Sequence, residues 1–222
     1  NTKWKRKYIG KNWYLGETLH SGIGQGYFQS TPMQLCLMMA QLANGGYEIK
    51  PRVLAGSNDE SNKLKEYIKY KNENPNKTLP VDLLVANFNL NPLFRNQENI
   101  NFIKDSMFAS TNEPGGTSYR SRLTDKKFTF AGKTGSSQVK RFTVEQREAE
   151  IKQKDLVYKD RDHALFIAFA PYNDPKYAIS VVVEHGGSGS SAAAPIAKKA
   201  IKKVLERDEL RTSQASQIGK EI

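Results

Sequence analysis

The sequence predicts an α+β domain in which an antiparallel sheet is flanked by helices. Three segments, 128–139, 163–172 and 176–184, have the apolar composition and the bounding turns of strands, and the last two are joined by the turn Tyr-Asn-Asp-Pro. Helical patterns precede and follow them, with no internal repeats and no βαβ units. Because the second and third segments are apolar on both faces, we expect them in the middle of a covered sheet.

The best-marked helix lies within residues 30–46, which read STPMQLCLMMAQLANGG. Thr31 and Gln34 form a capping box, Pro32 takes the first helical position, and two glycines end the helix. Its composition is apolar nearly all round, which predicts burial. The single cysteine, Cys36, is then expected to be a small buried hydrophobe.

The chain after this helix is expected to run over the surface. Residues 47–56 are typical of a strand that is interrupted at Pro51, and therefore of an edge or bulged strand. Residues 56–80 are polar and rich in asparagine and turn residues, so they predict a surface insertion.

Three more helices are predicted from periodicity. The first spans 96–110 behind an Asn96 cap, the second spans the charged segment 143–158 outside the core, and the last spans 192–208. A flexible tail is expected over 208–222. The expected apolar positions are Ile100, Ile103, Met107 and Phe108 in the first helix, and Ala193, Ile196, Ala200, Ile201, Val204 and Leu205 in the last.

Composition excludes several classes of protein. The net charge of +11 comes from 24 lysines and 10 arginines that are spread along the chain without a nucleic-acid-reading motif, so no nucleic-acid partner is expected. No apolar run approaches the about 20 residues that span a bilayer. The three histidines and one cysteine are scattered, which predicts no metal site, and no cofactor is expected. Because the chain begins at Asn1, we expect a fragment of a longer protein.

The stretch FTFAGKTGSSQV, residues 128–139, allows two readings. A phosphate-binding loop would need glycine where Lys127 stands, and it would need to open a helix. The flanking residues are β-type instead, so Lys133-Thr134-Gly135 is expected on an exposed strand. The run Gly22-x-Gly24-x-Gly26 is not a dinucleotide fingerprint, because Tyr27 occupies the place of the required glycine.

Several motifs together resemble one family. The segments GIGQGYFQSTPMQ, AGKTGSSQV and HALFIAFAPYNDPKYAISVVVEHGG, with the closing helix, are similar to the C-terminal half of the transpeptidase domain of penicillin-binding protein 2, an elongation-type class B enzyme. The resemblance runs from about Trp4 to Leu205. It implies a partial penicillin-binding protein/serine β-lactamase-like fold, with 1–222 as the C-terminal portion of one transpeptidase domain.

The resemblance also implies chemistry. In this family a serine of an S-x-x-K motif attacks a stem peptide, an S-x-N motif assists proton movement, and a K-[ST]-G strand completes the site. Carried over, Lys133 lends positive charge, Thr134 hydrogen-bonds the substrate carboxylate, Gly135 leaves space for peptide backbone, and the Ser136 N–H joins the oxyanion hole.

Two further matches are expected to be chance. Ser137-Gln-Val-Lys140 spells S-x-x-K but lies on a predicted strand, where residues three apart point to opposite faces. Ser110-Thr-Asn112 spells S-x-N in a segment of other purpose. His163 and His185 are expected to be structural. The chain would then lack the nucleophile and be inactive alone.

The implied function of the complete protein is a serine-type peptidoglycan D,D-transpeptidase of cell-wall elongation. Its expected partners are stem peptides, β-lactams and wall-elongation membrane proteins, including a SEDS-type glycosyltransferase, at the periplasmic face of a bacterial inner membrane. The alternatives are a non-catalytic peptide- or partner-binding module and a β-lactam-hydrolysing relative.

Overall fold

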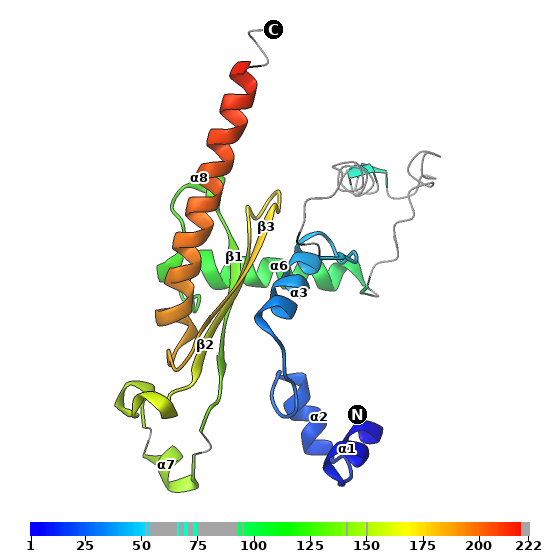
Figure 1. Ribbon diagram of the computed structural model, residues 1–222, viewed down its shortest axis with the longest axis vertical. Helices are drawn as coiled ribbons and strands as arrows, with labels where there is room; N and C mark the ends of the chain where they lie inside the picture. Colours follow the sequence, from blue (N-terminus) through cyan, green and yellow to red (C-terminus); the bar gives the residue numbers. More distant parts are fainter. Residues whose placement is uncertain are drawn as a thin grey trace.

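The computed structural model shows a three-stranded antiparallel sheet with helices on both faces (Figure 1). Strands β1 (Ala131–Ser137), β2 (His163–Ala170) and β3 (Tyr177–Val183) lie in the order β1-β2-β3. This confirms the predicted α+β class. The structure describes residues 1–51, 53, 66, 69–70, 73–74, 93–94, 96–140, 142–149 and 151–218.

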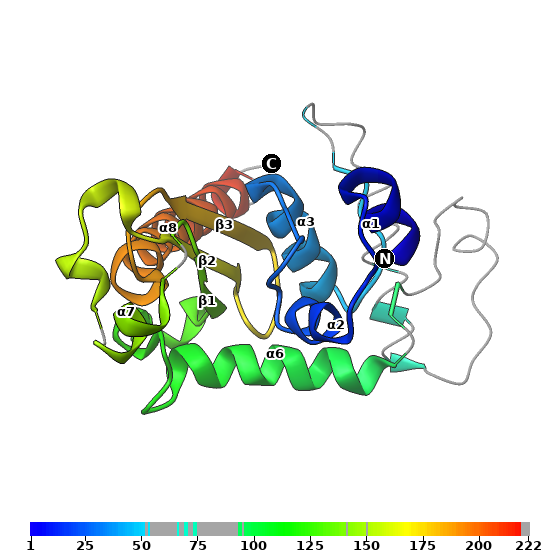
Figure 2. The same cartoon turned by 90° about the horizontal axis from the view of Figure 1, so that it is seen from below.

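Helices pack against the sheet in two layers (Figure 2). The long helix α8 (Ala194–Ile218) covers one face. Helix α3 (Pro32–Ala43) covers the other face, and α6 (Gln97–Asn112) runs beside β1. The sheet is therefore the middle layer of the molecule.

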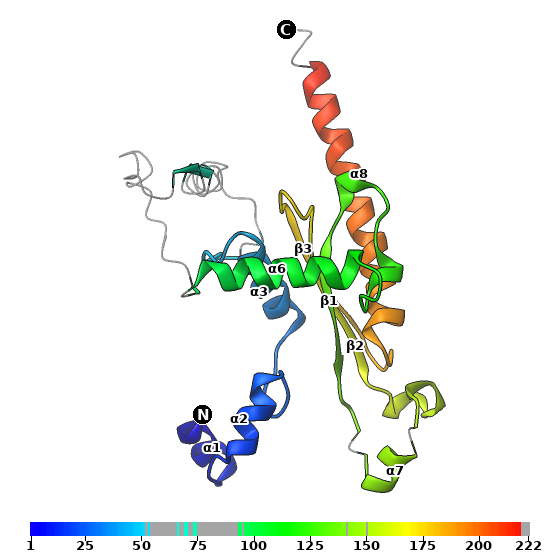
Figure 3. The ribbon, with the colours of Figure 1, turned by 180° about the vertical axis from the view of Figure 1, so that it is seen from behind.

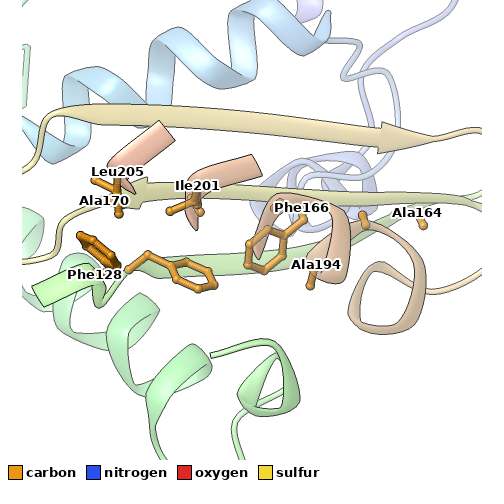
Figure 4. Packing of buried hydrophobic residues seen from close by; sticks show 11 residues of the cluster. Phe128, Ala164, Phe166, Ala170, Ala194, Ile201 and Leu205 are labelled. Carbon is orange, nitrogen blue, oxygen red and sulfur yellow. The ribbon is translucent and has the colours of Figure 1, made fainter. Parts of the chain in front are cut away.

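The central strand β2 is buried on its α8 side and partly buried on the other side, which agrees with its apolar sequence. Ala164, Phe166 and Ala168 face α8, and the Phe166 ring meets the Phe130 ring edge-on with centroids 6.2 Å apart (Figure 4). Phe169 belongs to the second cluster, formed with α3, α6 and Ala131 of β1. Successive side chains of the strand thus supply two separate cores.

The third strand differs from its expected place. β3 pairs with β2 on one side, and within the described residues no strand pairs with its other side. Among the described residues, β3 is therefore an edge strand rather than a central one. Its register with β2 is regular, from Ala164 opposite Val183 to Ala170 opposite Tyr177.

Helix α3 begins as its capping box predicts. The Gln34 N–H donates to the Thr31 hydroxyl at 3.2 Å, and the Thr31 N–H donates to the Gln34 side chain at 2.9 Å. The expected burial all round is wrong, because only one side of α3 faces the sheet, and Met33 and Met38 are exposed. Cys36 is half-buried, and burial raises the pKa of its thiol.

Residues 47–51 do not form the expected strand, and most of 52–56 lies outside the described residues. The reason is that side chains at the end of the preceding helix form hydrogen bonds with this backbone. Asn44 accepts from the Tyr47 N–H and donates to its carbonyl, while Gln41 accepts from the Ile49 N–H. The predicted insertion 56–80 also lies largely outside the described residues.

The Asn96 cap of α6 is confirmed, since its side chain accepts from the Glu98 N–H at 2.8 Å. Ile100 and Met107 are buried as predicted, whereas Ile103 is exposed. The charged segment 143–158 is not one helix. It contains the short α7 (Val144–Glu148) and the 3-10 turns η3 (Gln153–Asp155) and η4 (Tyr158–Asp160).

The buried side of α8 differs from the predicted stripe. Ile201 and Leu205 are buried as expected, but Ile196 and Val204 are exposed, and Ala194 and Ala197 are buried instead. Positions 194, 197, 201 and 205 follow helical spacing on one side, while 196 and 204 lie about 100° away. The helix continues to Ile218, so residues 208–218 are helical where a flexible tail is expected, and 219–222 lie outside the described residues.

Two helices precede α3 and lie apart from the sheet (Figure 3). They are α1 (Thr2–Ile9) and α2 (Leu15–Gly22), and neither helix was predicted from the sequence. Lys5 is buried between them, pairs with Glu17, and lies 4.7 Å from the centre of the Tyr14 ring. An ion pair, rather than an apolar core, therefore joins α1 to α2.

Short turns complete the described chain. These are the 3-10 turns η1 (Tyr119–Ser121) and η2 (Lys126–Phe128) before β1, and the π-helical turn η5 (Gly189–Ala193) before α8. Among the described helices, none combines the length and the apolar character that crossing a membrane requires.

Gly132 is required by close packing inside the sheet. A Cβ at this position would lie 2.3 Å from Cζ of Phe166 and 3.0 Å from the Ile167 carbonyl oxygen. Because Phe166 is fully buried, it has no free space to enter. We expect Gly132→Ala to lower the free energy of unfolding by about 1–3 kcal/mol.

Gly135→Ala is the matched control, since its Cβ would meet only the Leu165 Cβ, at 3.4 Å. Urea denaturation of the two variants measures the difference. Equal unfolding midpoints for both variants would contradict the packing argument.

Candidate functional site

The four residues predicted to form a site, Lys133 to Ser136, all lie in β1, at one edge of the sheet. The pairing of β1 with β2 is one to one from Ala131 opposite Phe169 to Ser137 opposite His163. The described strand therefore contains no bulge. Lys133 and Thr134 consequently start on opposite faces of the sheet.

The outer backbone of β1 is bound at its beginning by α6. The Gly132 N–H donates to the Thr111 hydroxyl at 3.0 Å, and the Gly132 carbonyl accepts from the same hydroxyl group at 3.3 Å. The Asn112 side chain donates to the Phe130 carbonyl at 2.9 Å. Side chains from the last turn of α6 thus take the place of a neighbouring strand.

This contact reveals which backbone groups face outward. In an antiparallel pair, the N–H and C=O of one residue point to the same edge, and the direction alternates along the strand. Since Gly132 points away from β2, Thr134 and Ser136 do so as well. Among the described residues, none of α6 hydrogen-bonds the N–H or C=O groups of Thr134 and Ser136, which form the open part of the edge.

The Lys133 ammonium lies at this open part of the edge. Its Nζ donates to the Thr134 carbonyl at 2.9 Å, and the side chain is exposed. The side chain therefore bends around the strand to reach the outward-facing backbone. The Lys133 ammonium and the backbone of Thr134 therefore meet at the same part of the edge.

The Thr134 hydroxyl also reaches the edge, from the other face. It lies 3.3 Å from the hydroxyl of Thr117, which in turn lies 3.1 Å from that of Ser110. Thr117 was not among the predicted site residues. The only local signal for it is the glycine pair 115–116, which turns the chain after α6.

Gly135 and Gly189 shape the two sides of the strand at the site. A Cβ on Gly189 would lie 2.4 Å from the Leu165 carbonyl oxygen and 2.7 Å from that of Gly135, so η5 packs directly on this backbone. Gly135 itself meets little on its own side. The strand is therefore covered on one face and accessible on the other.

A cluster of hydrogen bonds lies where the end of β1 pairs with the start of β2. The His185 N–H donates to Nδ1 of His163 at 2.9 Å, and Nδ1 of His185 lies 3.0 Å from the Arg161 carbonyl oxygen. His185 adopts a left-handed conformation with φ of 53°. The buried Asp162 accepts from the Val139 N–H and from Gln153. These contacts support a structural role for both histidines.

The serines of the two further matches, Ser137 and Ser110, do not lie at the start of a helix. Ser137 is on β1, and the Lys140 ammonium is 2.6 Å from Asp160, which lowers the pKa of that carboxyl. Ser110 lies in the last turn of α6, with its hydroxyl toward Thr117. Neither serine begins a helix with a lysine one turn later.

Other potential sites are poorly formed. In the part of the chain that the structure describes, no three His, Cys, Asp or Glu side chains gather closely enough to hold a metal ion. An open groove of about 1090 Å³ lies along the outer half of α8, between Lys127, Lys176 and Arg207. It carries charges of both signs and is formed by elements other than β1.

Comparison with known proteins gives the site a context. Residues 5–202 match the family model described as penicillin binding protein transpeptidase domain. The chain is 35% identical over 196 residues to peptidoglycan D,D-transpeptidase MrdA of Salmonella typhimurium. The aligned region covers 88% of this chain and 28% of the relative. It is 33% identical over 197 residues to the protein of the same name from Haemophilus influenzae, covering 89% of this chain and 27% of the relative.

Solved structures agree with these matches. The chain is similar to PBP2 of Helicobacter pylori, solved in complex with MreC, with a TM-score of 0.64 and 28% identity, covering 93% of this chain and 30% of that one. It is also similar to PBP2 of Pseudomonas aeruginosa, solved in complex with WCK 5153, with a TM-score of 0.59 and 33% identity, covering 89% and 34%. The chain thus spans less than a third of the length of the curated relatives.

The position of Ser110 and Ser137 yields a prediction for the 222-residue chain on its own. We expect no covalent adduct with a fluorescent penicillin, because neither hydroxyl has a lysine placed to remove its proton. Denaturing electrophoresis and intact-mass measurement after incubation test this. A stoichiometric adduct on either serine would mean that the chain carries its own nucleophile.

Proposed function

The chain belongs to the penicillin-binding protein transpeptidase domain family, and from that membership we propose that it supplies the Lys-Thr-Gly strand of a peptidoglycan D,D-transpeptidase. The observation that carries the proposal is the open edge of β1, where the Lys133 ammonium and the outward backbone of Thr134 and Ser136 meet. An extended peptide can add to such an edge by main-chain hydrogen bonds.

We propose one role for each residue of the strand. Lys133 supplies a cation beside the bound peptide and biases proton transfer at the nucleophile. Thr134 donates its hydroxyl proton to the carboxylate at the end of the substrate. Gly135 keeps the accessible face of the strand clear for peptide backbone, and the Ser136 N–H donates to the oxyanion of the tetrahedral intermediate.

The reaction is an acyl transfer in two steps. A serine hydroxyl attacks the penultimate D-Ala carbonyl, the terminal D-Ala leaves as the amine, and an ester to the enzyme is formed. The amine of a neighbouring stem peptide then attacks this ester, which releases the serine and completes the cross-link. We propose that this serine and the S-x-N motif belong to the remainder of the protein, in keeping with the greater length of the relatives.

The wider setting is proposed on the same grounds. β-Lactams would acylate the same serine, because their strained amide imitates the substrate. The substrates would be peptidoglycan stem peptides at the periplasmic face of a bacterial inner membrane. The partners would be membrane proteins of wall elongation, including a SEDS-type glycosyltransferase.

The role of Lys133 is tested in the full-length protein by its rate of acylation by benzylpenicillin. Lys133→Ala removes the cation at the edge while leaving the backbone in place. We expect a loss of about 2–4 kcal/mol of transition-state stabilisation, or roughly 30- to 1000-fold in rate. Gly135→Val should mainly raise the benzylpenicillin concentration needed to reach a given rate of acylation, since the added side chain blocks entry of the ligand to the strand.

Lys126→Ala, an exposed lysine in η2, is the matched control for loss of one positive charge. Circular dichroism melting of every variant reports folding. If the Lys133 and Gly135 variants were acylated like wild type, β1 would be an ordinary strand and the proposed function of this edge would be wrong.

A further inference from the structure

Two hydroxyl groups lie beside the proposed site without a role in it, those of Thr117 and Ser110. Together with Thr134 they form a row, with oxygens 3.1 Å apart between Ser110 and Thr117 and 3.3 Å apart between Thr117 and Thr134. We infer that Thr117 is a positioning residue, which holds the Thr134 hydroxyl so that its proton points to the substrate carboxylate. This inference rests on the proposed function.

The segment that carries Thr117 is fixed in place. The Ser118 N–H and the Ser118 hydroxyl both donate to the Ser110 carbonyl, at 3.0 and 3.1 Å. Gly116 lies so close to α6 that a Cβ would be 2.3 Å from the same carbonyl oxygen. Ser118 and Thr111 are buried, and their hydroxyl oxygens lie 3.2 Å apart. The neighbours of Thr117 are therefore locked to α6, which in turn binds Gly132 of β1.

The direction of the hydrogen bonds follows from counting protons. Each hydroxyl has one proton to donate and can accept from its neighbours. If Thr134 donates to a carboxylate, its oxygen must accept from Thr117, and Thr117 must then accept from Ser110. Ligand binding thus selects one orientation of the whole row. Hydroxyls aligned in this way polarise one another, which strengthens the bond to the carboxylate.

A second consequence concerns the alternative orientation. Without Thr117, the Thr134 hydroxyl is free to rotate and to direct its proton elsewhere, for example to water. Thr117 is exposed in the free chain, so water competes with this row until a ligand covers the edge. The effect is therefore expected mainly in the ligand-bound state, and it requires that the ligand carry a carboxylate.

The test uses acylation of the full-length protein by benzylpenicillin and by its methyl ester, which lacks the negative carboxylate. We expect Thr117→Val to slow acylation by benzylpenicillin about threefold to tenfold, as for loss of one hydrogen bond near a charge. Thr117→Ser should restore the rate, because it keeps the hydroxyl. With the methyl ester, Thr117→Val and wild type should differ by less than about twofold.

Ser110→Ala should give a smaller loss in the same direction, since Ser110 acts one step further from the ligand. The matched control is Thr124→Val, an exposed threonine in the same connection between α6 and β1. An equal loss for both ligands would show that Thr117 only supports the fold, and an unchanged rate with benzylpenicillin would also overturn the inference. A wild-type protein that is not acylated at all would instead overturn the proposed function.

Discussion

The outer edge of β1 imposes the constraint on which the rest of the site depends. Backbone N–H and C=O groups at a sheet edge must find partners, and an uncovered edge will bind another extended chain. In this protein Thr111 and Asn112 of α6 bind the edge at Phe130 and Gly132, and their contacts end there. The edge continues to Thr134 and Ser136, where the Thr134 carbonyl accepts from the Lys133 ammonium. One helix thus stabilises the strand and, under the proposed function, sets where a peptide would begin to pair.

The same arrangement explains why the small residues of this region are needed. Gly132 allows the Phe166 ring to lie against the strand, and Gly189 allows η5 to lie against the backbone of Gly135. Both glycines bring the layers on the α8 side closer than any side chain would allow. The strand is therefore held rigidly from one face, while Gly135 keeps the other face clear. In the proposed function, a strand held in this way would present its donors to developing charge without having to move during the reaction.

Features set by neighbouring residues could be predicted from the sequence, and features set by distant contacts could not. The caps at Thr31 and Asn96 depend on residues two or three positions away, and both were predicted correctly. Ile196 and Val204 were expected in the core because they are large and apolar, yet close packing selects the small Ala194 and Ala197 instead. The strand containing Lys133 was anticipated, but Thr117 was not. Its hydroxyl reaches Thr134 only because a turn folds back onto α6, and the spacing of residues does not encode that contact.

The central claim is that the outward amide of Ser136 is available in the free protein and is taken up by the ligand. Hydrogen exchange resolved to single amides, measured on the full-length protein before and after acylation by benzylpenicillin, tests it most directly. We predict slow exchange for the amides of Gly132, Lys133 and Gly135 in both states, because α6 or β2 binds them. The Ser136 amide should exchange rapidly in the free protein and slowly in the acylated one. Exchange at Ser136 that is already slow in the free protein, or that is unchanged by acylation, would contradict the account.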